Sequence, residues 1–100
     1  MSASERSTLV VGASGIVGRA AFEHLSRQPG ERVFGASRRA PDVETGTYVP
    51  LDLLDRAACR GAVAALPPIT HVVYAALQEK PGLLEGWYDP EIMETNRRML

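Results

Sequence analysis

The stretch Gly12-Ala13-Ser14-Gly15-Ile16-Val17-Gly18 repeats glycine at every third position, directly after the apolar run Ser7–Val11. An apolar run without polar alternation is typical of a strand that is buried on both faces, as in a parallel sheet. Beyond the glycines, Val17, Ala21 and Leu25 recur at the spacing of one helix face. The sequence therefore predicts a strand, a glycine turn and a helix in direct succession.

Each glycine of this turn meets a separate physical demand of a dinucleotide site. Gly12 allows a sharp turn off the strand, Gly15 leaves room for a pyrophosphate beside the backbone, and Gly18 lets the helix pack closely on the sheet. The N–H groups at the start of the helix carry partial positive charge and hold the diphosphate, and the Ser14 hydroxyl adds a donor. This context favours dinucleotide binding over the alternative of a purely structural glycine turn.

Three further strands and two further helices are expected along the chain. The strands are predicted over Glu31–Ser37, Thr47–Leu51 and Thr70–Ala75, and the helices over Arg56–Leu66 and Glu91–Leu100. Alternating strands and helices predict an α/β fold with a doubly wound, Rossmann-type parallel sheet of strand order 3-2-1-4. The connection Ala40–Gly46 is too short for a good helix, so the crossover between the second and third strands is expected to be minimal.

The end of the second strand indicates which dinucleotide the site takes. An NAD site usually has Asp or Glu about 20 residues after the glycines, where it holds the ribose 2′-hydroxyl. This sequence has Ser37-Arg38-Arg39 there. A guanidinium pairs with the 2′-phosphate that a carboxylate would repel, so NADP(H) is favoured over NAD(H). The alternative is a pair of solvated arginines at a strand end.

Residues after the third and fourth strands are expected at the same ligand-binding edge of the sheet. Asp52 is expected to accept a hydrogen bond from the adenine amino group and Leu53 to cover the ring. The alternative is that Asp52 or Asp55 only caps the following helix. Ala75 and Ala76 are small enough for the cofactor's ribose to lie against the backbone, or they are plain core residues.

The composition argues against several kinds of partner. The chain has 100 residues with 11 basic and 12 acidic side chains, a net charge of −1, which disfavours nucleic acid and membrane surfaces. No apolar stretch approaches the roughly 20 residues that span a bilayer, and no signal-peptide pattern opens the chain. No cluster of His, Cys or Asp has metal-ligand spacing. The single cysteine, Cys59, favours a reduced, cytoplasmic protein.

A small-molecule substrate is the expected partner, and the sequence indicates no particular oligomeric state. Trp87-Tyr88 stand in a long loop on the ligand side of the predicted sheet. They either form a wall over the substrate or pin the loop.

Together these segments resemble the start of an extended or atypical short-chain dehydrogenase/reductase, related to the NAD-dependent epimerases and dehydratases. The likeness is greatest to the progesterone 5β-reductase and iridoid synthase group. It rests on Gly12–Gly18, Val33–Arg39 (VFGASRR), Leu51–Asp55 (LDLLD), Thr70–Tyr74 (THVVY) and Glu94–Leu100 (ETNRRML).

The resemblance implies a role for several residues. Ser14-Gly15-Ile16 would hold the diphosphate, Arg38 and Arg39 the 2′-phosphate, and Asp52-Leu53 the adenine. Ala76 would lie on the nicotinamide side. The group uses NADPH to deliver hydride to the β-carbon of an activated enone.

Two positions depart from the pattern of that group, and its catalytic residues are not matched. Ser14 stands where the group has Thr, and Ala76-Leu77 stand where it has Thr-Trp. The family's catalytic Tyr and Lys are expected beyond residue 100, so no catalytic residue is assigned here. A nucleotide-sugar epimerase or dehydratase and a non-catalytic NADP-binding regulator or sensor are the alternative functions.

The length bears on how much of the fold is present. A dinucleotide fold needs two βαβαβ halves, and only the first is recognisable here. The last helical pattern runs to Leu100 without a stop signal, and the fourth strand would have an open edge. We therefore expect residues 1–100 to be the N-terminal, cofactor-binding part of a longer enzyme, inactive and poorly stable on its own.

Overall fold

The computed structural model describes residues 6–77 and 89–99. Its elements are β1 (Arg6–Val11), α1 (Ile16–Ser26), β2 (Glu31–Ser37), β3 (Thr47–Pro50), α2 (Arg56–Ala65), β4 (His71–Tyr74) and α4 (Pro90–Met99). The order of elements is the predicted one, and the bounds differ by a residue or so from those expected. Trp87, Tyr88 and Leu100, for which the sequence made predictions, lie outside the described residues.

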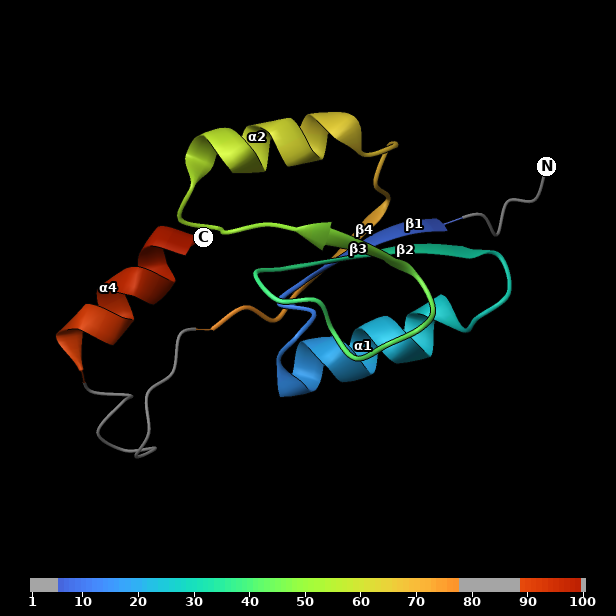
Figure 1. Cartoon of the computed structure of the whole chain (residues 1–100), viewed down its shortest axis with the longest axis horizontal. Coiled ribbons are helices and arrows are strands. Elements are labelled where there is room, and N and C mark those ends of the chain that lie inside the picture. The colour runs from blue at the N-terminus through green and yellow to red at the C-terminus, as the bar shows by residue number, and fades with distance from the viewer. Residues whose placement is uncertain (1–5, 78–88, 100) are drawn as a thin grey trace.

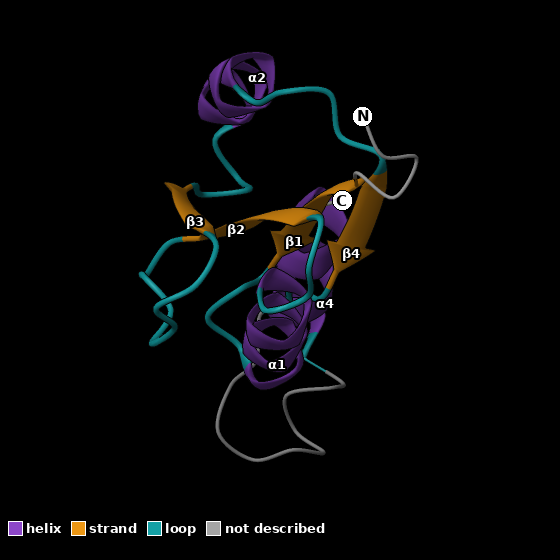
Figure 2. Ribbon diagram, turned by 90° about the vertical axis from the view of Figure 1, so that its right-hand side faces the viewer, coloured by secondary structure: helices purple, strands orange, loops and turns teal. Residues whose placement is uncertain are grey.

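The strands form one parallel sheet in the order β3-β2-β1-β4, as predicted. Val11 is the register partner of Ala36 in β2 and of Tyr74 in β4, so these strands end at one level. Ser37 is paired in the same way with Pro50 of β3. We call this end of the sheet the carboxyl edge. Helix α1 lies against one face of the sheet and α2 lies over the other, while α4 lies beyond the carboxyl edge (Figures 1 and 2).

The core lies between α1 and the sheet. It consists of Val10, Ala13, Phe22 and Val33, with Ala21, Leu25, Val43 and Val73 packed against it. Phe22 is the largest side chain and is only 1% exposed. A side chain at Gly35 would place its Cβ 3.0 Å from the Phe22 ring, so glycine there makes room for the ring to lie on the sheet.

The prediction that Val17 belongs to the buried face of this helix is wrong. Val17 is 70% exposed, and the buried positions of α1 are Gly18 and Phe22. Gly18 determines which face of α1 is buried, because its backbone packs directly against the Gly12 carbonyl. Val17 then points about 100° away around the helix axis. The prediction for Ala21 and Leu25 is confirmed, since both pack against the core.

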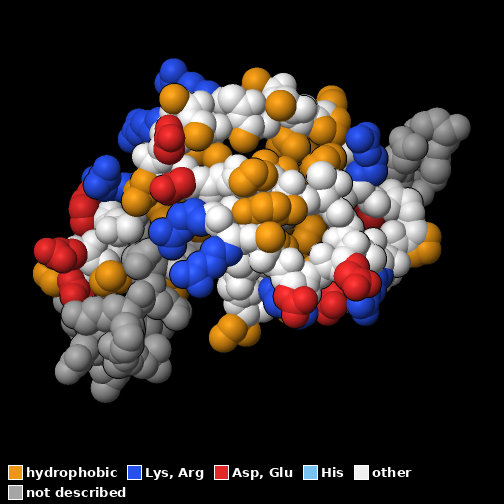
Figure 3. All heavy atoms as spheres, in the orientation of Figure 1, with side chains coloured by type: hydrophobic (Ala, Val, Ile, Leu, Met, Phe, Trp, Pro, Cys, Tyr) orange, Lys and Arg blue, Asp and Glu red, His pale blue; other side chains and the backbone are white. Residues whose placement is uncertain are grey.

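The opposite face of the sheet is covered less completely. Helix α2 has no buried residue, and apolar side chains gather between α2 and the sheet on the face shown in Figure 3. Val63 of α2 is 58% exposed, and Val72 and Tyr74 of β4 are 61% and 42% exposed. In the part of the chain that the structure describes, β4 pairs only with β1 and forms one edge of the sheet.

The connection between β2 and β3 contains no helix, as expected from its length. It folds back beneath the sheet and packs on α1. Gly46 has a φ of +80°, and an added Cβ there would lie 2.6 Å from the Phe22 ring. The same aromatic ring therefore supports both the helix and this connection.

We predict that Phe22→Ala lowers the free energy of unfolding of the intact protein by about 3–5 kcal/mol, because it removes the ring around which the core is built. The matched control is Val17→Ala on the same helix, which should change that free energy by less than about 0.5 kcal/mol because the side chain is exposed. Urea unfolding measures both values. Equal losses for the two variants would contradict the observed helix face.

Candidate functional site

A hollow of about 160 Å³ opens at the carboxyl edge of the sheet. It lies where the chain leaves β1, β2, β3 and β4, with one residue added from α4. The residues that line it are Gly12, Ser14, Gly15, Ala36, Ser37, Arg38, Leu51, Asp52, Leu53, Leu54, Ala75, Ala76, Leu77 and Met99. Crevices at this edge, outside the carboxyl ends of the strands, are where open parallel sheets bind ligands.

The three glycines of the turn are constrained very differently. Gly12 has a φ of +89°, and an added Cβ would lie 2.7 Å from the backbone of Ala75 and Ala76. A Cβ on Gly18 would lie 1.9 Å from the carbonyl oxygen of Gly12. Gly12 and Gly18 are therefore required by the fold itself. The Cβ of a residue at position 15 would meet only the Gly12 oxygen, at an ordinary 3.5 Å.

Gly15 is thus the glycine that the fold alone does not require, which fits the role predicted for it. It lines the hollow and is the N-cap of α1. No side chain of the described residues caps the first turn of this helix, and its leading N–H groups have no partners within the helix. The space beside Gly15 and these N–H groups suit the close approach of a diphosphate.

Two residues of the predicted turn site lie outside the lining of the hollow. The Ile16 side chain is 93% exposed, so any contribution of Ile16 to a diphosphate comes from its main-chain N–H. Gly18 is buried in the helix–turn contact. Its role is the close packing predicted for it. Ser14, by contrast, lines the hollow as expected and is exposed.

The end of β2 brings one of the two predicted arginines to the hollow. Arg38 lines it, whereas Arg39 lies outside the lining. Ser37 is buried beneath them, and its hydroxyl donates a hydrogen bond to the Arg39 carbonyl. The Ser37 carbonyl accepts from the Leu51 N–H and the Tyr48 hydroxyl, both at 2.9 Å. Ser37 therefore fixes the turn that carries the arginines and ties it to β3.

The two aspartates after β3 have separate roles. Asp55 is the N-cap of α2, and its Oδ1 accepts a hydrogen bond of 3.0 Å from the Ala58 N–H. Asp52 lines the hollow, and its Oδ1 accepts from the Leu54 N–H at 3.0 Å. A carboxylate has about four lone-pair sites, so this turn leaves Asp52 able to accept from a ligand amino group.

The small residues after β4 are held against the glycine turn. The Ala75 N–H donates to the Val11 carbonyl at 2.8 Å, which extends the pairing of β1 and β4 by one residue. Ala75 and Ala76 both line the hollow and both face Gly12. Both alanines pack on the turn and also border the hollow, and the ribose contact expected of them stays a prediction.

Five lining residues were not predicted from the sequence. They are Ala36, Leu51, Leu54, Leu77 and Met99. Four of them are next to, or one residue away from, predicted site residues at strand ends, and that adjacency was the available signal. Met99 comes from α4, whose placement against the strand ends has no local signal in the sequence.

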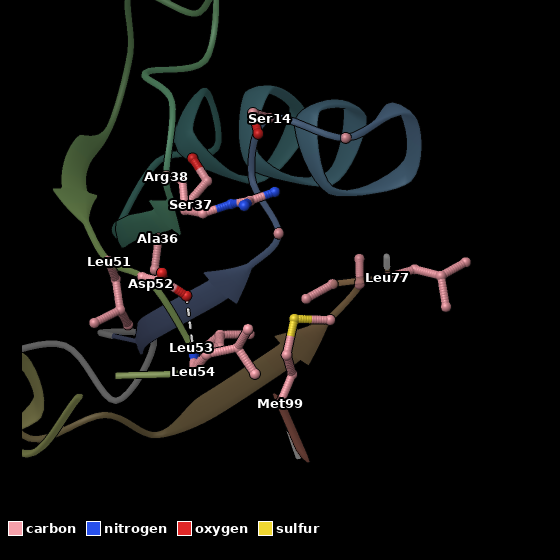
Figure 4. A pocket seen from close by; sticks show the side chains of 14 residues that line it. Ser14, Ala36, Ser37, Arg38, Leu51, Asp52, Leu53, Leu54, Leu77 and Met99 are labelled. Atoms are coloured by element: carbon pink, nitrogen blue, oxygen red, sulfur yellow. Dashed lines mark hydrogen bonds between the residues drawn. The ribbon is translucent and has the colours of Figure 1, made fainter. Parts of the chain in front are cut away.

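The lining has a polar side and an apolar side (Figure 4). Ser14, Ser37, Arg38 and Asp52 lie along one side, and Leu53, Leu77 and Met99 lie along the other. Such a hollow suits a ligand that has both charged phosphates and a flat, largely apolar ring. Together with the open space beside Gly15, these residues fit the adenosine diphosphate portion of a dinucleotide.

The described residues near the hollow include no assigned catalytic group. Tyr74 ends β4 but lies outside the lining of the hollow. Partial burial raises the pKa of its hydroxyl above the ordinary value.

Residues 6–77 and 89–99 contain neither a candidate metal cluster nor a candidate membrane-spanning helix. Within these ranges no group of three or more His, Cys, Asp or Glu side chains is placed to hold a metal ion. No helix in the same ranges combines the length and the apolar character needed to cross a membrane.

The model of the NAD dependent epimerase/dehydratase family matches residues 8–98. The chain belongs to this family. The match spans the glycine turn, the arginine turn and the segments that follow β3 and β4. A search of curated proteins finds no match.

Solved structures of dehydrogenases and reductases share the fold of this family member. The NADPH-bound carbonyl reductase from chicken fatty liver superposes on 94% of the chain with a TM-score of 0.69 and 19% identity. The aldohexose dehydrogenase of Thermoplasma acidophilum superposes on 94% of the chain with a TM-score of 0.68 and 20% identity. The chain covers 42% and 38% of these two proteins.

A third structure is more similar in sequence. The uronate dehydrogenase of Agrobacterium tumefaciens has 27% identity and a TM-score of 0.54 over 94% of the chain, which covers 37% of that protein. The chain thus spans about two fifths of the length of these structures.

We predict that Gly15→Ala in the intact protein weakens NAD(P)H binding about tenfold or more, because a methyl group occupies the space beside the diphosphate. The free energy of unfolding should fall by less than about 1 kcal/mol, since the added Cβ meets no close atom. Calorimetric titration and urea unfolding measure the two effects.

The matched control is Gly61→Ala in α2, where an added Cβ has no heavy atom within 4 Å. This variant should bind the cofactor as the wild type does. Unchanged binding in Gly15→Ala would exclude the diphosphate from this position.

Proposed function

We propose that this chain is the NADP(H)-binding part of an oxidoreductase that transfers hydride between the nicotinamide and a carbonyl or enone substrate. The observation that carries the proposal is the presence of Arg38 in the same hollow as the glycine turn. One ligand can therefore reach the start of α1 with its diphosphate and the end of β2 with its adenosine ribose.

The choice of NADP(H) over NAD(H) rests on the charges at the end of β2. Residues 37–39 are Ser, Arg and Arg, with no carboxylate to bind a ribose 2′-hydroxyl. A guanidinium can form two charge-assisted hydrogen bonds to a phosphate. Arg38 would make this contact from within the lining, and Arg39 would add to it from the adjacent surface. The similar chicken carbonyl reductase was solved with NADPH.

The other lining residues would divide the cofactor between them. Gly12, Ser14 and Gly15, with the N–H of Ile16, would hold the diphosphate. Asp52 would accept from the adenine amino group, and Leu53 would cover the ring. Ala75 and Ala76 would border the ribose on the nicotinamide side. The bound nicotinamide would supply or receive the hydride. The residues of this chain would hold and orient the cofactor.

The substrate is proposed at the level of chemical class. The sequence resemblance to the progesterone 5β-reductase and iridoid synthase group favours an enone, whereas the similar uronate and aldohexose dehydrogenases are named for sugars and their acids. Both classes are small molecules. In both, the substrate carbon that accepts or donates the hydride would lie beside the nicotinamide. We place the domain in the cytoplasm, as the single reduced cysteine suggests.

A second candidate is a nucleotide-sugar epimerase or dehydratase, and the family to which the chain belongs favours it. Such an enzyme would recycle its cofactor within one turnover. Net oxidation or reduction of NADP(H), followed at 340 nm with the intact protein, separates the two. Residues 1–100 would in either case contribute the N-terminal part of a dinucleotide-binding domain.

We predict that Arg38→Ala raises the Kd for NADPH about tenfold, because it removes a charge-assisted phosphate contact. The Kd for NADH should change by less than about twofold, since NADH has no 2′-phosphate. Arg39→Ala should have a smaller effect on NADPH, and the double variant the largest. Isothermal titration of the intact protein with each dinucleotide measures these constants, and equal weakening of NADPH and NADH would contradict the 2′-phosphate assignment.

A further inference from the structure

The segment 38–46, which carries both arginines from β2 to β3, is held by contacts at its start, middle and end. It has no helix or strand of its own, so side-chain hydrogen bonds help to determine its path, together with the packing of Val43 on the core and of Gly46 on Phe22. The three hydrogen bonds join the Ser37 hydroxyl with the Arg39 carbonyl, the Arg19 guanidinium with the Asp42 carbonyl, and the Ser26 hydroxyl with the Thr45 hydroxyl. Two of the three come from α1.

The middle contact is made by a charged side chain to the main chain. The Nη2 of Arg19 donates to the Asp42 carbonyl oxygen at 2.8 Å, while the Oδ2 of Asp42 is 3.8 Å away on a side chain that is fully exposed. The Arg19 side chain itself is 39% exposed. A charged donor on a carbonyl forms a stronger hydrogen bond than a neutral one. Arg19 therefore holds the course of the backbone at position 42 and depends little on the side chain there.

The position of Arg19 connects this contact to the hollow. Arg19 follows Gly18 directly and lies in the first turns of α1. The N-terminus of α1 borders the hollow. The Arg19 side chain of the same helix donates a hydrogen bond to the main chain of the segment that carries Arg38. The helix thus links the place proposed for the diphosphate to the place proposed for the 2′-phosphate.

We propose that Arg19 is a positioning residue that sets the preference for NADPH over NADH. It lies outside the lining of the hollow and acts through segment 38–46, which it holds in the path that keeps Arg38 at the hollow. The inference rests on the proposed function, because it takes Arg38 as the partner of the 2′-phosphate.

The expected effect falls on one cofactor because only one of them uses the segment. Without the Arg19 contact, residues around Asp42 gain conformational freedom that binding of the 2′-phosphate to Arg38 must then remove. NADH has no phosphate at that position and does not require the segment to be ordered. A residue that only supported the fold would weaken both dinucleotides together.

The test is Arg19→Met in the intact protein, with the Kd for NADPH and for NADH measured by isothermal titration. We expect the ratio of the two constants to move about fivefold against NADPH, the effect of losing one hydrogen bond of ordinary net strength. Arg19→Lys, which restores a charged donor, should return the ratio to within about twofold of the wild type.

Two matched controls come from the same contacts. Arg27 is the C-cap residue of α1 and pairs with Glu23, as Arg19 does, but its guanidinium contact is to this residue of the helix and not to segment 38–46. Arg27→Met should leave the ratio unchanged. Asp42→Ala should also leave it unchanged, because the contact is to the main-chain carbonyl.

The outcomes separate this inference from the function on which it rests. A wild-type protein without a preference for NADPH would overturn the proposed function and the inference with it. A wild-type preference that Arg19→Met leaves intact, or a loss that is equal for both dinucleotides, would overturn the inference alone. An equal change of the ratio in Arg27→Met would show a general charge effect and would also overturn it.

Discussion

The backbone contact between helix α1 and the turn after β1 is the constraint on which the rest of the structure depends. A Cβ at Gly18 would lie 1.9 Å from the Gly12 oxygen, and a Cβ at Gly12 would lie 2.7 Å from the chain leaving β4. Three segments are thus stacked main chain on main chain, with no side chain between them. Because of this stacking, Phe22 of α1 packs on the sheet and the ends of β1 and β4 lie side by side. The start of α1 borders the hollow for the same reason.

The hollow exists because parallel strands end together, and its chemistry comes from what each strand leaves there. The turn after β1 supplies space and N–H groups, β2 supplies a cation, and the segment after β3 supplies a carboxylate beside leucines. Ser37 is central to this arrangement, because its hydroxyl shapes the arginine turn while its carbonyl binds the chain on either side of Pro50. Binding groups from distant parts of the sequence are therefore oriented by ordinary backbone hydrogen bonds.

The sequence predicted the fold well because its strongest signals are local. Uninterrupted apolar strands, glycines at a fixed spacing and an Asp before an Ala-rich segment each act within a few residues, and Asp55 does cap α2. The failures concern choices made by tertiary packing. The apolar spacing placed Val17 on one face with Ala21 and Leu25, because a pattern of apolar residues does not register that the neighbouring Gly18 is buried. Tertiary packing also places Met99 in the lining of the hollow, and it places Arg38 there but not Arg39. Neighbouring residues in the sequence predict neither outcome.

The pairing pattern of the sheet also has a consequence for how the chain acquires its structure as it is synthesised. Residues 6–37 comprise β1, α1, β2 and the turns between them, and they contain all four buried residues of the cluster around Phe22. Neither β3 nor β4 lies between the two central strands. This N-terminal unit can therefore collapse on the ribosome from near-neighbour contacts, which form faster than distant ones. Strands β3 and β4 extend this unit on its two sides, and the hollow needs the ends of all four strands.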